Sequence, residues 1–197
     1  MAKYEGGDCY LDPETGVLRN RLGITDEQRL AQAEASLVAW RSYELSQKPL
    51  AGDFDLAHLQ AIHRHLFGDV YDWAGEIRTI DLAKGNTYFA HHPYIVSASR
   101  PIFEPLKKER YLQGLNPAAF SERAADYLGE INALHPFREG NGRAQREFIN
   151  HLAWASGYTI DWSAIHPDEL MQASIESFHG GEITSLADLI KANLQDR

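Results

Sequence analysis

The sequence predicts a mainly α-helical protein that folds as a single domain over residues 1–197. Most of the chain places apolar residues three and four positions apart, which is the spacing of one helix face. One segment, residues 76–92, is instead rich in β-prone residues around a Gly-Asn turn. No repeat, linker or low-complexity block divides the chain, and its length suits one compact core.

The first three helices follow from caps and apolar spacing. Thr25 with Gln28 forms a capping box for the first helix, and Asp55 caps the second. Gly68 provides a stop for the second helix. A third helix is expected from Ser97 to Leu112, although it contains two prolines. The apolar residues expected to face inward are Leu30, Ala33, Leu37 and Trp40 in the first helix and Leu59, Ile62 and Leu66 in the second.

Four further helices are expected in the second half. Asn116 caps the fourth, with Pro117 in its first turn. Its apolar residues occupy one face up to the point where the chain meets His135. The remaining helices are expected from Gly142 to near Gly157, from Pro167 to Phe178 and from Ser185 to Leu194.

The β-prone segment reads as a hairpin. Its two arms contain Ile77, Thr79 and Ile80, then Thr87, Tyr88 and Phe89, on either side of Lys84-Gly85-Asn86. An isolated hairpin on a helical domain has a free edge that could pair with an extended segment of another chain. The alternative is an ordinary surface turn.

Composition restricts the partners. The net charge of -9 and the pI near 5.4 argue against a general nucleic-acid or membrane-surface binder, because both need a basic face. The N-terminus lacks a secretion signal, and no stretch approaches the roughly 18 apolar residues of a membrane span. Cys9 is the single cysteine, so no internal disulfide can form. We therefore expect a cytoplasmic protein without nucleic-acid or membrane partners.

The stretch HPFREGNGRAQR, residues 135–146, carries the candidate chemistry. Gly140-Asn141-Gly142 lies where a new helix begins, so backbone N–H groups can converge there with the positive end of the helix dipole. Arg143 and Arg146 follow on that helix three residues apart, so we expect both to lie on one face and to point toward the same end as the glycine loop. Such an anion nest with two guanidinium groups suits a polyphosphate.

Two further residues suggest a reaction. Glu139 beside a phosphate implies a divalent cation between them, because one carboxylate plus phosphate oxygens is a common way to hold Mg²⁺. His135 is the candidate general base for an attacking hydroxyl. Phe137 is expected to point into the core, and Arg138 is expected to face solvent.

The other paired histidines do not predict a metal site. His63 with His65 and His91 with His92 lack the further ligands that a CxxC or HExxH pattern would supply. We expect these four to be surface or packing residues. The glycine loop is also no Walker loop, because GxxxxGK[ST] does not occur.

HPFREGNGRAQR resembles the signature HxFx[D/E]GN[G/K]RxxR of Fic-domain proteins and matches it at every specified position. Two further stretches are similar to short stand-alone bacterial Fic toxins and to the N-terminal domains of related secreted effectors: YDWAGEIR at 71–78 and YLDPETGVLRNRLG at 10–23. The resemblance covers nearly the whole chain. It implies a compact helical bundle with a β-hairpin flap at about 76–92.

The resemblance also implies an activity, namely transfer of AMP from Mg-ATP to a hydroxyl side chain of a target protein. By that resemblance His135 would be the base and Glu139 would hold Mg²⁺. The nucleotide would be bound by Phe137, Gly140, Asn141, Gly142, Arg143 and Arg146 of the motif and by Lys84 and Gly85 of the flap. The target would pair with the flap at Ile80, Asp81, Leu82 and Phe89.

Regulation and target are expectations of the same kind. Fic enzymes are typically silenced by a helix bearing [S/T]xxxE[G/N], whose glutamate pairs with the second motif arginine, here Arg146. That pattern does not occur in this chain, so we expect a separate small antitoxin protein that supplies it. The resemblance suggests type II topoisomerase subunits, DNA gyrase and topoisomerase IV, as targets.

Other functions stay open from sequence. The same fold could transfer phosphate, UMP or phosphocholine, or could be the N-terminal domain of a secreted effector. A nucleotide-gated binding module without catalysis is the third class.

Overall fold

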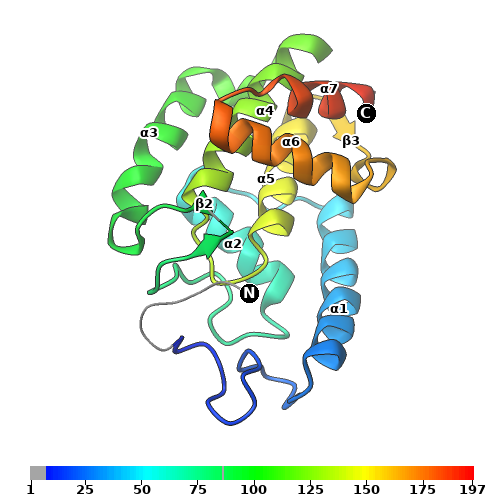
Figure 1. Cartoon of the computed structure of the whole chain (residues 1–197). Coiled ribbons are helices and arrows are strands. Elements are labelled where there is room, and N and C mark those ends of the chain that lie inside the picture. The colour runs from blue at the N-terminus through cyan, green and yellow to red at the C-terminus, as the bar shows by residue number, and fades with distance from the viewer. Residues whose placement is uncertain (1–7, 86) are drawn as a thin grey trace.

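The computed structural model describes residues 8–85 and 87–197 and is mostly helical, as predicted (Figure 1). Within the described residues, the α-helices are α1 (Glu27–Gln47), α2 (Leu56–Phe67), α3 (Ile95–Lys108), α4 (Pro117–Leu134), α5 (Asn141–Ala155), α6 (Pro167–Gly180) and α7 (Thr184–Ala192). Short 3₁₀ turns lie at His92–Tyr94 (η1), Arg110–Leu112 (η2) and Trp162–Ala164 (η3). No described helix combines the length and apolar character needed to cross a bilayer.

Helices α4 and α5 form the centre of the bundle. Figure 1 shows α3 and α1 on opposite sides of them, with α6 and α7 crossing above. Phe120, Ile131 and Phe148 are fully buried in the shared core. Burial of each such side chain stabilises the fold by about 1.5–3 kcal/mol. The core therefore holds rigid the two helices that flank the motif loop.

Two small antiparallel sheets complete the fold. The hairpin pairs β1 (Ala83–Lys84) with β2 (Thr87–Tyr88) in the register Ala83↔Tyr88. It is much shorter than the predicted arms, and Ile77, Thr79 and Ile80 lie outside it. Asn86 of the predicted turn lies outside the described residues. The second sheet, β3 (Tyr158–Ile160) with β4 (Leu194–Asp196), was not predicted.

The first helix departs from its prediction at both its cap and its inner face. Asp26 is the N-cap and accepts a hydrogen bond from the Arg29 amide, so the predicted Thr25 capping box is wrong. Trp40 was expected inside and is 60% exposed. It lies two residues after buried Val38, about 200° around the helix, and hence on the opposite face. The buried face of α1 includes Glu34 beside Leu30, Val38 and Leu45.

Other helix ends shift by a few residues. The third helix ends at Lys108 and not at Leu112, because residues 110–112 adopt positive φ angles that no α-helix accommodates. The last helix ends at Ala192, and Leu194 begins β4. These shifts leave the predicted architecture intact.

Candidate active site

The motif loop joins α4 to α5, and two left-handed residues form its corners. His135 follows α4 with φ 46° and Gly140 precedes α5 with φ 78°. Between them, the Asn141 side chain closes the loop: its Nδ2 donates to the Phe137 carbonyl at 2.7 Å and its Oδ1 accepts from the Phe137 amide at 2.9 Å. The side-chain amide of Asn141 therefore shapes the loop, because both of its polar atoms are hydrogen-bonded to the Phe137 backbone.

Phe137 points into the core, as predicted, and is fully buried. Its ring stacks on His63 at 3.9 Å between centroids. Nδ1 of His63 accepts from the Gly75 amide at 2.8 Å, so its protonated Nε2 donates to the Glu139 carbonyl at 2.9 Å. Burial lowers the pKa of His63 to about 4, and the ring is neutral at pH 7. His63 is thus a packing residue that holds the motif loop.

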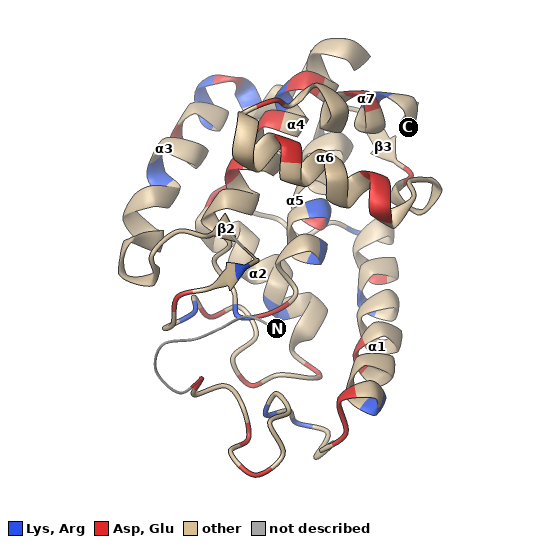
Figure 2. Ribbon diagram, viewed as in Figure 1, with Lys and Arg blue, Asp and Glu red and all other residues tan. Residues whose placement is uncertain are grey.

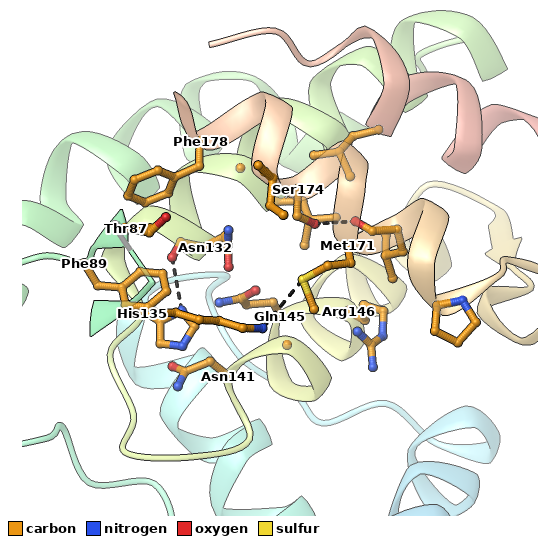
Figure 3. A pocket seen from close by; sticks show the side chains of 18 of the residues that line it. Thr87, Phe89, Asn132, His135, Asn141, Gln145, Arg146, Met171, Ser174 and Phe178 are labelled. Atoms are coloured by element: carbon orange, nitrogen blue, oxygen red, sulfur yellow. Dashed lines mark hydrogen bonds between the residues drawn. The ribbon is translucent and has the colours of Figure 1, made fainter. Parts of the chain in front are cut away.

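A cavity of about 870 Å³ lies between the motif loop, the flap and α6. Figure 3 shows the side chains of Phe89, His135, Arg146, Met171 and Phe178 around it. Of the residues expected to act in the site, those that line the cavity are Lys84, Phe89, His135, Glu139, Asn141, Gly142 and Arg146. The flap thus meets the motif across one space.

The His135 ring is fixed in a single orientation. Its Nδ1 lies 3.2 Å from the Asn132 carbonyl, which can only accept, so Nδ1 carries the proton. The ring stacks on Phe89 of the flap at 3.7 Å between centroids. Burial lowers the pKa of His135 to about 3. The imidazole is therefore neutral at pH 7, and Nε2 keeps the lone pair that a base requires.

Groups that could bind an anion lie on another wall of the cavity. The first intrahelical bond of α5 runs from the Ala144 amide to the Gly140 carbonyl, so the amides of residues 141–143 precede the helical ladder. The Arg146 guanidinium lines the cavity without a hydrogen bond or ion pair to any described residue. Burial lowers the pKa of Arg146, yet arginine stays charged. Figure 2 shows basic positions on the first turns of α5, below α6.

Glu139 has the properties of a cation ligand. Its carboxylate is 46% exposed, and Oε1 accepts a hydrogen bond from the Gly140 amide at 2.9 Å. The second oxygen has no hydrogen bond within the described part of the chain. One available carboxylate oxygen beside an anion-binding helix start fits a Mg²⁺ ion that also takes phosphate oxygens.

Arg143 does not join Arg146 in the cavity. Its Nη2 pairs with Glu34 of α1 at 2.6 Å and lies 3.7 Å from Glu139. The guanidinium also stacks over Phe67, 4.6 Å from the ring centroid. The buried Glu34 draws this arginine toward α1, so the expectation that both motif arginines face the same space does not describe this structure.

The flap residues assigned to the target are divided. Ile80, Asp81 and Leu82 do not line the cavity, and neither does Gly85, which was expected to bind the nucleotide. Leu82 is buried, and the Asp81 carboxylate is bound to His91 and His92. Phe89 alone of this group reaches the cavity. The flap also contacts α6, through Lys84 Nζ to Met171 Sδ at 3.6 Å and Thr87 to His179 at 3.1 Å.

Arg138 contradicts its prediction. It was expected to face solvent, but its side chain is 11% exposed and pairs with Asp8 at 2.7 Å. Asp8, near the N-terminal end of the described residues, supplies this carboxylate. A contact across 130 residues leaves no local sequence signal.

Sequence reasoning missed Arg78, the residue that ties the flap to the site. Arg78 is 1% exposed and donates to three carbonyl groups: His135 at 2.8 Å, Ile80 at 2.6 Å and Ala90 at 2.5 Å. It therefore links both ends of the flap to the backbone of the candidate base. The available signal is its place at the end of YDWAGEIR, the stretch that resembles Fic proteins.

Comparison with known proteins agrees with this geometry. Residues 53–153 match the Fic/DOC family. The chain is 49% identical over 197 residues to the protein adenylyltransferase VbhT of Bartonella schoenbuchensis. The match covers all of this chain but only 41% of that protein. It is 43% identical over 182 residues to a probable protein adenylyltransferase Fic of Escherichia coli, which covers 92% of this chain and 90% of that protein.

Solved structures have the same fold. BepC of Bartonella tribocorum, with bound AMPPNP, superposes with a TM-score of 0.88 at 30% identity over 95% of this chain and 97% of that one. The N-terminal Fic domain of a VirB-translocated effector of Bartonella quintana, with bound ADP, has a TM-score of 0.89 at 29% identity, and 95% of each chain is covered. With the motif, the flap and the cavity in place, this chain belongs to the Fic/DOC family.

Proposed function

We propose that the chain is a protein adenylyltransferase, which transfers AMP from ATP to a hydroxyl side chain of a target protein and releases pyrophosphate. The observation that carries this proposal is the neutral His135, whose Nε2 lone pair lies beside a cavity with an anion-binding helix start. The names of VbhT and the E. coli relative, and the AMPPNP bound to BepC, support the choice of nucleotide.

In this reaction His135 accepts the proton of the target hydroxyl as the oxygen attacks the α-phosphorus. The bond from the α-phosphorus to the bridging oxygen breaks, and pyrophosphate leaves. A base with a pKa of about 3 is weak, but the negative charge of a bound triphosphate raises the proton affinity of a nearby imidazole. The hydrogen bond to Asn132 keeps Nε2 facing the hydroxyl throughout.

The remaining groups bind and orient the nucleotide. The α5 amides and Arg146 would neutralise phosphate oxygens, and Lys84 reaches over the same cavity from the flap. Glu139 would hold Mg²⁺, which supplies charge neutralisation of the triphosphate. Arg143 acts from outside the cavity, through its contacts with Glu34 and Glu139.

The test is the mass added to a target. Gyrase subunits and the chain itself would be incubated with Mg-ATP and weighed intact, using the wild type, His135→Ala and, as control, the exposed His166→Asn. A gain of about 329 Da in the wild type and the control, absent in His135→Ala, is expected for AMP transfer. A gain of about 80 Da would replace AMP by phosphate as the transferred group. A gain retained in His135→Ala would refute the role of the base.

We further propose that Arg146 is the contact for a separate antitoxin carrying the [S/T]xxxE[G/N] helix. A guanidinium without a partner among the described residues can accept either a phosphate or a carboxylate, and the two compete. Arg146→Ala should weaken both ATP binding and inhibition by the antitoxin. Full transfer with antitoxin in molar excess over the wild type would contradict this regulation.

Type II topoisomerase subunits are proposed as targets on the family resemblance alone. If gyrase and topoisomerase IV gain no mass while the chain binds ATP, the proposed target class is wrong. The target would then be sought by labelling a whole lysate with tagged ATP. The chain spans less than half of VbhT, so a role as one part of a longer secreted effector is the alternative setting for the same chemistry.

A further inference from the structure

Three side chains with metal-binding atoms meet at the base of the flap, outside the cavity. The Asp81 carboxylate contacts Nδ1 of His91 through one oxygen and lies 3.0 Å from Nδ1 of His92 through the other. The ligand atoms of all three lie within 4.8 Å of one another. Sequence spacing showed only the histidine pair. The fold adds the third ligand from ten residues away.

The position of this cluster matters for the hairpin. Asp81 lies two residues before β1, and His91 and His92 follow β2 by three and four residues. The strands themselves are only two residues long, and an isolated hairpin of that size is marginally stable. The three side chains therefore join the two ends of the flap where the strands do not.

The donor set suits a zinc-class cation. Two imidazole nitrogens and one carboxylate oxygen are common Zn²⁺ ligands, and such three-ligand sites leave one position open. Each ring now directs a nitrogen at Asp81. A cation at this point would take Nδ1 of each ring in the tautomer that carries its proton on Nε2. The side chains of Asp81 and His91 are 53% and 55% exposed, and an ion can enter from solvent.

The surroundings of Asp81 set both its geometry and the expected strength. The His92 amide donates to Oδ1 at 2.7 Å, and such a hydrogen bond orients a ligating carboxylate. The buried Arg78 guanidinium lies 3.8 Å from the same oxygen. Its positive charge opposes a cation, so binding should be micromolar and weaker than in a structural zinc site.

We propose that Asp81, His91 and His92 form a Zn²⁺ site that clamps the base of the flap. Zinc bound there connects the two ends of the hairpin and stabilises it. The inference stands apart from the proposed AMP transfer, since the cluster lies outside the cavity and uses none of its residues.

Zinc binding would be measured by calorimetry on the untagged, EDTA-treated chain, with Zn²⁺ as titrant. The wild type is expected to bind one ion per chain in the micromolar range. Asp81→Asn and the double variant His91→Gln/His92→Gln should each weaken binding at least about tenfold. In Asp81→Asn the amide oxygen can still accept from the His92 amide, so the backbone contact is retained.

The matched control is His166→Asn. His166 and Asp168 form an exposed pair at 3.7 Å without a second histidine, and loss of this imidazole should leave zinc binding unchanged. Zinc should also raise the melting temperature of the wild type and of the control but not of the Asp81 and histidine variants. Absence of binding at 100-fold molar excess of zinc, or binding that survives both variants, overturns the proposal.

Discussion

Gly140 offers the sharpest test of how the motif loop is built, because its substitution by alanine has two separable costs. The residue has φ 78°, and a left-handed conformation costs a non-glycine residue about 1–2 kcal/mol. An added Cβ would also lie 2.9 Å from Cε1 of Phe67 and closer still to Cζ. The Phe67 ring cannot easily move away, since it is fully buried and contacts His63 and Arg143.

Overpacking of this kind costs about 1–3 kcal/mol, so Gly140→Ala should lower the free energy of unfolding by about 2–5 kcal/mol in total. Gly157 supplies the matched control. It also has a positive φ, 86°, but a Cβ there meets nothing within 4 Å. Gly157→Ala should therefore lose only the backbone term, about 1–2 kcal/mol.

The assay is thermal and urea unfolding of both variants beside the wild type. In a chain of this size 1 kcal/mol corresponds to about 2–4 °C, so the two melting temperatures should differ by about 2–12 °C. Gly140→Ala should also bind ATP more weakly, because relief of the clash displaces the α5 amides. Equal melting temperatures for the two variants would refute the close packing of Phe67 against the loop.

Three further predictions concern residues that support the site. The pKa of His63 is lowered to about 4 in the folded chain, so its contribution to stability is complete above about pH 6.5 and falls as the pH drops from there toward 4. When the pH is lowered from 7.5 to 5.5, the free energy of unfolding measured in urea should therefore fall by about 1.4 kcal/mol less in His63→Gln than in the wild type. Equal losses would contradict the assignment. Glu34→Gln should lower the free energy of unfolding by about 1.5–3 kcal/mol, because it weakens the ion pair with Arg143. Glu44→Gln weakens a more exposed ion pair and should lower it by at most about 1 kcal/mol in the same urea assay. Similar losses in the two variants would refute the stronger contribution of the Glu34 pair. Arg78→Lys keeps the charge but cannot span three carbonyl groups, so kcat should fall by about 10- to 100-fold with little change in ATP affinity measured by calorimetry, and unchanged kcat would show that Arg78 does not position the base.

Much of the fold could be predicted because its determinants are local. Apolar residues three and four positions apart and an Asn-Pro start identify α4, and the Asp55 cap identifies the start of α2. Predictions failed where the structure depends on a contact between distant residues or on which neighbouring residue faces the core. Trp40 has the right spacing but lies on the outer face of α1, and β4 pairs with β3 across more than thirty residues.

The candidate site divides in the same way. His135, Glu139 and Arg146 lie within twelve residues, so the sequence displays them together. Glu34 and Arg78 come from elsewhere in the chain, and the sequence does not distinguish a charged residue that is buried from the many that are exposed. Arg143 shows the consequence, because the position of Glu34 redirects a motif side chain that spacing alone placed beside Arg146.

The two hydrogen bonds between Asn141 and Phe137 determine whether the conformational entropy of the motif loop is lost on folding or on nucleotide binding. Ordering a residue costs about 1–2 kcal/mol in backbone entropy. Because the amide closes the loop without help from any ligand, this cost for residues 137–140 falls on folding and not on nucleotide binding. An incoming nucleotide meets a surface that is already arranged, and its interactions contribute to affinity without first having to immobilise the backbone.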